Sequence, residues 1–186
     1  MNTSQTKTNP IHIMFDIETM GLLPSAALTQ VGVIAFKQVG VSNEVLSEQV
    51  FNVSPDHWGD NGRSFSGSTV AWWFNQAEAA RKSITSGLLS QKSVVEAFHR
   101  FVSNNLDKEE GFIWSKGNLD IIVMEDLFRV HGLPCPWKYW QVRDLRTLLW
   151  IADPKLERTG VQHDALDDAR FQLRQLEESL KKIEVV

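Results

Sequence analysis

The sequence predicts an α/β fold: a mixed central sheet of three antiparallel N-terminal strands followed by β/α units, with helices on both faces. Two observations support this prediction. Apolar segments bounded by turn residues fill the first third of the chain, and helical periodicity alternates with short apolar segments in the rest. The length of 186 residues and the hydrophobic content of 42% support one compact core.

Three segments near the N-terminus have the composition of strands. They are rich in Val, Ile and Phe, and Gly, Pro or Asn residues separate them. We expect hairpins between them and therefore antiparallel pairing. The predicted strands are Ile11–Asp16, Gln30–Phe36 and Val45–Val53.

Helices are expected after the Gly- and Ser-rich stretch at residues 58–67. Ser68 is expected to cap one helix, and Ser90 to precede another whose apolar residues recur on one side. Strands and helices then alternate, which makes the sheet mixed. The expected segments are a strand at 112–115, a helix at 118–131, a strand at 139–142, a helix at 144–151, a loop at 152–162 and a final amphipathic helix.

The ends of the chain and its composition indicate where the protein works. Residues 1–10 are polar and lack an apolar signal region, so we expect a disordered tail ahead of a single domain at residues 11–186. No stretch approaches 18 consecutive apolar residues, so no membrane-spanning helix is expected. The single Cys135 cannot form an intramolecular disulfide, which suits a reducing cytoplasm. The net charge of −4 disfavours broad binding of duplex nucleic acid.

Asp16 and Glu18 flank one isoleucine at the end of the first predicted strand. In an extended strand, side chains at positions i and i+2 lie on the same face, about 7 Å apart. A segment rich in Ile and Phe is typical of a buried strand, where charges are unfavourable unless a positive partner compensates them. The pair is therefore predicted to bind a cation. A similar pair, Asp107 and Glu109, lies in a polar stretch and is expected to be solvated.

The last predicted helix begins near a histidine that an acid follows five positions later, His163 and Asp168. At about 100° per residue, Asp168 lies nearer the apolar stripe of this helix than Asp167 does. Asp168 is therefore the candidate ligand, and Asp167 is expected to be solvated. Asp164 falls in the first turn, where the helix dipole alone explains an acid.

These residues occur in an order that resembles the three motifs of the DEDDh family, the proofreading and RNase T-like 3′–5′ exonucleases of the DnaQ/RNase T-like superfamily. Asp16 and Glu18 match the first motif. Asp120 matches the second, and His163 with Asp168 matches the third. The resemblance covers most of the chain, and the third motif is its most specific part.

Three further segments look like the phage DexA-type exonucleases and their bacterial exoribonuclease relatives. These segments are residues 68–73, 114–117 and 143–147. The resemblance implies an RNase H-like fold, which agrees with the predicted order of strands and helices. It also implies an enzyme that hydrolyses phosphodiester bonds at the 3′ ends of single-stranded nucleic acid. A homodimer is expected by analogy with RNase T-like enzymes.

The resemblance further implies a site for two divalent cations, Mg²⁺ or Mn²⁺, which prefer oxygen ligands. In such a site the ions lie about 3.5–4 Å apart. By resemblance, Asp16 bridges both ions, and Asp120 supports the second. Glu18 and Asp168 complete the first. His163 is implied as the general base, a role that its ordinary pKa of about 6.5 suits at neutral pH.

Two groups of residues are candidates for binding the last nucleotide. The resemblance implies a cradle formed by Thr19, Met20 and Gly21, although a strand-ending turn at Gly21 explains this stretch as well. Adjacent positions on a helix diverge, so of Trp72 and Trp73 one is expected to be buried and the other to face the groove. An exposed indole there would stack on a base.

Several alternatives stay open at this point. Lys116, Arg143 and Arg146 are candidates for contacts with phosphates, although ordinary surface charge also explains them. The dipeptide His163-Asp164 suggests an HD-type metal phosphohydrolase, but that fold is all-helical and needs further histidine ligands. A non-catalytic nucleic-acid-binding module of the same fold is a third possibility. The sequence does not distinguish DNA from RNA as the substrate.

Overall fold

The computed structural model describes residues 9–184, and most of the expected N-terminal tail at residues 1–10 lies outside this range. Five strands form one sheet in the order β3-β2-β1-β4-β5. Their bounds are Ile11–Thr19 for β1, Leu28–Val39 for β2, Ser42–Asn52 for β3, Ile113–Ser115 for β4 and Val142–Asp144 for β5.

The pairing of the strands confirms the predicted mixed sheet. Strand β1 pairs with β2, and β2 pairs with β3, in antiparallel orientation. Strand β4 pairs in parallel with β1 on one side and with β5 on the other. The carboxyl ends of β1, β4 and β5 therefore lie at the same edge of the sheet, which is where ligands bind in open α/β sheets.

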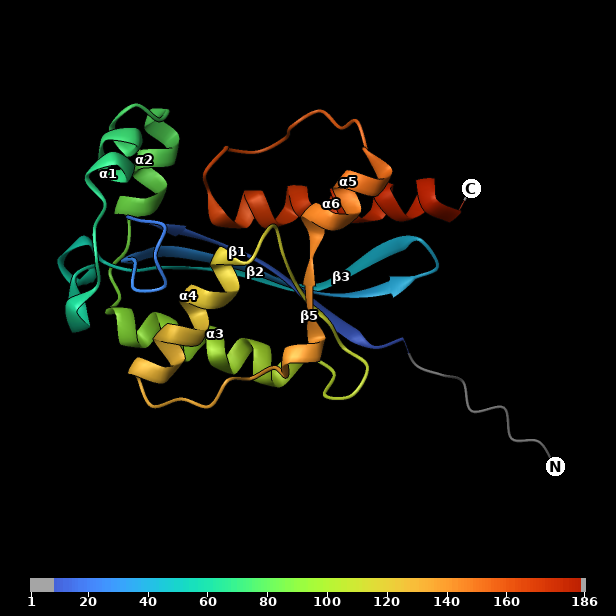
Figure 1. The fold of residues 1–186 in the computed structure, drawn as a ribbon, viewed down its shortest axis with the longest axis horizontal. Coiled ribbons are helices and arrows are strands. Elements are labelled where there is room, and N and C mark those ends of the chain that lie inside the picture. The colour runs from blue at the N-terminus through green and yellow to red at the C-terminus, as the bar shows by residue number, and fades with distance from the viewer. Residues whose placement is uncertain (1–8, 185–186) are drawn as a thin grey trace.

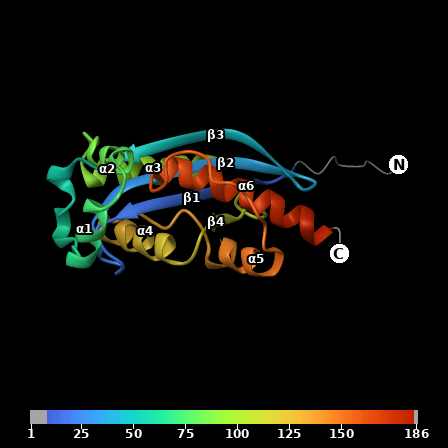
Figure 2. The same ribbon diagram turned by 90° about the horizontal axis from the view of Figure 1, so that it is seen from above.

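Six α-helices surround the sheet. Their bounds are Gly67–Phe74 for α1, Glu78–Thr85 for α2, Gln91–Asn105 for α3, Leu119–Val130 for α4, Leu145–Ala152 for α5 and Ala165–Glu184 for α6. Helices α3 and α4 cover one face of the sheet, α5 and α6 cover the other, and α1 and α2 lie at one end (Figures 1 and 2). None of the helices in this described part of the chain combines the length and apolar character needed to cross a membrane.

Alternation along β1 decides which face each side chain reaches. Ile13 and Phe15 pack into the cluster that α3 and α4 share, whereas Met14 packs into the cluster with α5 and α6. Because successive side chains of a strand point to opposite faces, Asp16 and Glu18 lie on the same face as Met14. Both acids therefore face α6.

Gly32 on β2 lets α6 approach the sheet closely. It pairs with Asp16 across the β1–β2 ladder. A Cβ atom built on Gly32 would lie 2.3 Å from the backbone nitrogen of Leu166, which is far inside van der Waals contact. Only glycine fits here, so the first turn of α6 lies directly against the strand beside Asp16.

Two local expectations were wrong. Residues 139–141 form a short 3₁₀ helix, and the strand begins only at Val142. The buried amide of Gln141 donates to the carbonyl oxygens of Asp107 and Gly111, so long-range hydrogen bonds hold this segment out of the sheet. Helix α1 begins at Gly67 with Ser66 at the N-cap position, two residues earlier than the expected cap at Ser68 would place it. Ser90 does cap α3, as expected.

Candidate active site

The five motif residues come from four places in the chain and line one pocket of 240 Å³. Asp16 and Glu18 lie at the carboxyl end of β1, and Asp120 lies in the first turn of α4. His163 precedes α6, and Asp168 lies in the first turn of that helix. The fold thus brings together all five residues predicted for the catalytic and metal sites.

The donor atoms suit a divalent cation. Atoms of Glu18, His163 and Asp168 that could serve as ligands all lie within 4.8 Å of one another. One oxygen of Asp168, Oδ1, is buried, accepts no hydrogen bond from a described residue and forms an ion pair with the guanidinium of Arg158. A buried carboxylate oxygen of this kind is stabilised by a cation. The residues present therefore fit the metal that the motifs imply.

Burial raises the pKa of three carboxyl groups in the pocket, and the charges of neighbouring carboxylates add to this effect. Burial, and then the charges of Asp120 and Glu18, raise the pKa of Asp16 well above its ordinary value. Burial is also the main reason why the pKa of Glu18 rises to about 8. The pKa of Asp120 rises to about 7, again chiefly through burial. Without a cation the site favours protonated carboxyl groups.

These shifts predict how the metal-free protein melts. Raised carboxyl pKa values give stability that is complete below the unfolded-state values of 3.8 and 4.5. That stability is lost as the pH rises through the folded-state values, about 7 for Asp120 and about 8 for Glu18. In chelator we therefore expect the melting temperature to fall steadily between about pH 5 and about pH 8.5. Thermal scans in a series of buffers test this.

The variant Asp16→Asn tests whether the charge of Asp16 destabilises the metal-free protein. It removes one charge from the cluster, so at pH 8 in chelator it should melt higher than the wild type. Excess Mg²⁺ or Mn²⁺ should stabilise the wild type by about 2.7 kcal/mol at a hundred times the dissociation constant, and the variant by much less. A variant that melts lower in chelator, or that gains as much from metal, would make Asp16 an ordinary structural acid.

The backbone of His163 is strained. Its φ angle is +64°, in the left-handed region that non-glycine residues seldom occupy. The imidazole packs edge to face against Trp72, with ring centroids 4.6 Å apart. Burial, and then the charge of Arg158, lower the pKa of His163 below 6.5. The ring is therefore neutral at pH 7, the form that accepts a proton.

The two neighbouring acids hold the start of α6 in place. Asp164 Oδ1 accepts hydrogen bonds from the backbone N–H groups of Leu166 and Asp167, which is a capping role. The expectation that Asp167 is simply solvated is wrong, because its Oδ2 accepts the backbone N–H of Val161 at 2.8 Å. Both acids thus fix the backbone on either side of His163. Asp168 is the acid that lines the pocket, as its position on the helix predicted.

Three cations also line the pocket, and the sequence analysis missed one of them. Lys116 and Arg146 were candidates for phosphate contacts, and the structure places both in the lining. Arg158 was not predicted, because it lies in the irregular segment between α5 and α6 and only the fold brings it to Asp168. Arg143 lies elsewhere, with its guanidinium 3.9 Å from the ring centroid of Phe112.

Gln172 is the second residue that the sequence analysis missed. Its Nε2 donates to Asp16 Oδ1 at 2.6 Å, and its side chain lines the pocket. The sequence did contain an indication of this position. Gln172 follows Asp168 by four residues, a spacing that places both side chains on one face of α6.

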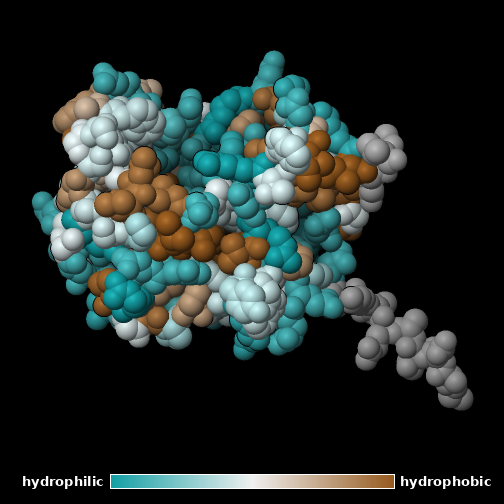
Figure 3. Space-filling model, viewed as in Figure 1, coloured by the Kyte–Doolittle hydropathy of each residue, from teal (hydrophilic) through white to brown (hydrophobic). Residues whose placement is uncertain are grey.

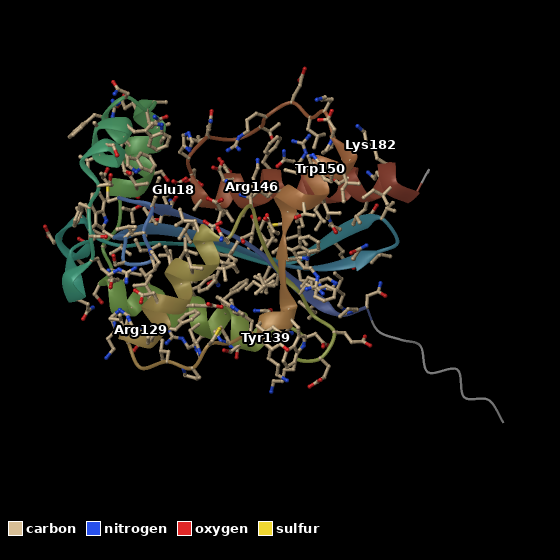
Figure 4. All side chains as sticks on the ribbon, viewed as in Figure 1. Glu18, Arg129, Tyr139, Arg146, Trp150 and Lys182 are labelled. Atoms are coloured by element: carbon tan, nitrogen blue, oxygen red, sulfur yellow. The ribbon has the colours of Figure 1, made fainter. Side chains whose placement is uncertain are left out.

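A second pocket of 430 Å³ adjoins the first, because Ile17, Glu18 and Leu119 line both. Thr19 and Trp72 face this second pocket. Figure 3 shows a hydrophilic hollow between the α1–α2 end and α6, bordered by hydrophobic surface. Figure 4 places Glu18 beside this hollow, with Arg146 further along the same face.

The other predicted binding residues lie beneath this surface. Trp73 is buried, and its indole N–H donates to the carbonyl of Thr19 at 3.0 Å. Met20 is buried in the cluster that contains Trp73. Gly21 forms a turn in which its carbonyl accepts a hydrogen bond from the Thr19 hydroxyl. Of the two tryptophans, one is buried and the other faces the groove, as their adjacent positions predicted.

The arrangement matches a known family. The family model for the 3′–5′ exoribonuclease Rv2179c-like domain matches residues 11–180 of the chain. The chain belongs to this family. It is also similar to the exodeoxyribonuclease of Enterobacteria phage T4, with 28% identity over 203 residues, 90% of this chain and 88% of that protein covered.

Solved structures share the fold of this Rv2179c-like domain. A full-length 3′-exonuclease matches with a TM-score of 0.63 at 10% identity, over 94% of this chain, which spans 62% of that chain's length. The Mg²⁺- and Mn²⁺-bound form of S. pombe Pop2p matches with a TM-score of 0.58 at 15% identity, over 91% of this chain and 82% of that one. These neighbours show that the fold is RNase H-like. The Rv2179c-like domain is accordingly a 3′–5′ exonuclease domain.

Proposed function

We propose that residues 11–186 act as one exonuclease domain that removes nucleotides from the 3′ ends of single-stranded nucleic acid, with two divalent cations and with His163 as the general base. One observation supports this most strongly. Asp16, Glu18, Asp120, His163 and Asp168 come from distant parts of the chain and meet in one pocket. A constellation of four carboxylates and one imidazole is suited to phosphodiester hydrolysis.

Each motif residue has a task in this mechanism. The four carboxylates would hold Mg²⁺ or Mn²⁺, which supplies charge neutralisation at the reacting phosphate and lowers the pKa of the attacking water. His163 Nδ1 or Nε2 takes the proton of that water, because the imidazole is neutral at pH 7. Its contact with Trp72 and the caps at Asp164 orient the ring.

The cations of the pocket have a separate role. Lys116, Arg146 and Arg158 line it together with the acids. Their positive charges attract the phosphates of the strand and balance charge that develops on the reacting phosphate. The acids repel this strand until cations bind, so we expect binding of substrate to depend on metal.

The second pocket supports the preference for an unpaired end. Trp72 offers an aromatic face beside Thr19 and Leu22, and this pocket continues into the one that contains the acids. A terminal base can stack on such a face only when it has left the helix stack, since bases within a duplex already have stacking partners. Stacking is tolerant of sequence, so we expect little base preference.

The nature of the sugar is a question for experiment, because the matched family is described as exoribonuclease and the phage relative as exodeoxyribonuclease. Oligomers of one sequence, as RNA and as DNA, single-stranded and in duplex, should be labelled at the 5′ end and incubated with Mg²⁺, Mn²⁺ or chelator. We expect a ladder of products shortened from the 3′ end, with metal only, and faster on single strands.

Three outcomes of this assay would contradict the proposal. Release of the 5′ label as a mononucleotide would reverse the polarity, and internal cuts would make the protein an endonuclease. Binding of the oligomer without any shortening in metal would favour the non-catalytic module. The same experiment with Asp168→Asn shows whether a contaminating nuclease produces the ladder.

A further inference from the structure

Gln172 makes an unusual contact for a residue in the buried stripe of α6. Its side chain is only 3% exposed, and its Nε2 donates to Asp16 Oδ1 at 2.6 Å. Within residues 9–184, no other side chain donates a hydrogen bond to Asp16. Hydrogen bonds to ionised carboxylates are stronger than those between neutral groups. The amide therefore fixes the orientation of the Asp16 carboxylate.

The other half of the same amide is left without a protein partner. Gln172 Oε1 is buried and accepts no hydrogen bond from any described residue. Buried acceptors are almost always paired, so an unpaired one calls for a specific explanation. Gln172 lines the pocket together with Asp16 and Asp168, so its amide belongs to the candidate catalytic site.

Packing alone does not explain a glutamine at this position. The neighbouring buried residues of α6 are apolar, among them Ala169, Leu173 and Leu176. A methionine would fill almost the same volume as Gln172 without burying an unpaired acceptor. A glutamate would keep the shape but add one more negative charge beside Asp16. The amide is the group that can donate to a carboxylate and also offer an acceptor.

We propose that Gln172 is a positioning residue for the exonuclease site. Its N–H group holds Asp16 so that the second carboxylate oxygen is free for the cation, and its Oε1 accepts a hydrogen bond from the hydrated cation. This inference rests on the proposed function, because it assigns a role toward the same metal. Groups that orient metal ligands typically change metal affinity or activity by about 10–100-fold when they are removed.

Gln172→Met is the decisive variant, and Gln141→Met is its matched control. Gln141 is also buried and donates to backbone carbonyl oxygens, but it does not line the pocket. Both variants should melt lower than the wild type in chelator. In a titration with Mn²⁺ followed by melting temperature, Gln172→Met should show an apparent dissociation constant about tenfold higher, and Gln141→Met an unchanged one.

Kinetics give a second, independent readout. At saturating Mn²⁺ we expect kcat of Gln172→Met to fall about tenfold, with KM for the oligomer unchanged, because the proposed role of Gln172 is toward Asp16 and the cation and not toward the substrate. Gln172→Asn keeps the amide but is one methylene too short to reach Asp16, so it should show the same loss. If Gln172→Met does not fold, Gln172→Asn takes its place as the test variant.

Wild-type Mn²⁺ affinity and kcat in a folded Gln172 variant would overturn the inference, and so would losses no larger than those of Gln141→Met. Failure of the proposed function has a different signature. In that case the wild type itself would gain no stability from Mn²⁺ and would not shorten the oligomer.

Discussion

We expect Asp16→Asn to lower exonuclease turnover at least about a thousandfold at saturating substrate, and Glu18→Gln, Asp120→Asn and Asp168→Asn to do the same. Each change removes one negative charge and half of the acceptor capacity of a group that lines the catalytic pocket. The four losses should not add when two variants are combined, because in the proposed mechanism the loss of one ligand already disables the shared site.

The control for this series is a second acid-x-acid pair. Glu109 lies in an exposed turn in which Asp107 accepts backbone N–H groups, and it does not line either pocket. Glu109→Gln should therefore retain normal turnover. Single-turnover release of a 3′-terminal nucleotide is the appropriate measurement. Near-normal turnover of any of the four site variants would remove that residue from the metal site.

We expect His163→Ala to lower the rate by about 10²–10⁴, since it removes the proposed general base. The expected effect on metal affinity is small if the imidazole acts as a base. A ring nitrogen of His163 lies within 4.8 Å of carboxylate oxygens of Glu18 and Asp168, so the geometry also permits His163 to bind the cation as a ligand. A Mn²⁺ titration of His163→Ala separates these roles, because a lost ligand would raise the dissociation constant as much as Asp168→Asn does.

The pH dependence of the rate tests the same residue. Burial and Arg158 lower the pKa of His163, so the neutral base persists below pH 6.5. The acidic limb of the rate profile should therefore fall below that value in the wild type and should be absent from His163→Ala. A limb that survives the substitution would belong to another group, such as Asp120, whose pKa is about 7 in the metal-free site.

Periodicity explains part of what could be predicted of this site from the sequence, and the resemblance to the DEDDh motifs supplied Asp120 and the role of His163. Strand alternation placed Asp16 and Glu18 on one face, and helical periodicity separated Asp168 from Asp167. Both are local rules that hold wherever the element forms. The divergence of Trp72 and Trp73 follows from the same geometry, and the structure shows one exposed to the second pocket and one buried.

The features that could not be predicted depend on tertiary contacts. Arg158 lies in an irregular segment that packs against α6. The contact of its guanidinium with the ring of Phe171 cannot be predicted from the periodicity of the sequence. The 3₁₀ turn before β5 forms because the Gln141 side chain donates to carbonyl oxygens 34 and 30 positions earlier in the chain. The composition of residues 139–141 predicted a strand, but these long-range hydrogen bonds favour the 3₁₀ turn instead.

The close packing of α6 against Gly32 means that the site forms from parts of the chain that are synthesised at different times. The contact between Asp16 and Gln172 joins residues that are 156 positions apart. Translation delivers the chain from its N-terminus at about 5–20 residues per second. The carboxylates of β1 are therefore synthesised before the residues of α6 that pack beside them. His163 and Asp168 reach them only when the last helix leaves the ribosome and settles on the sheet. A nascent chain that lacks α6 therefore has the acids of β1 but not the residues of α6 that line the same pocket, Asp168 and Gln172.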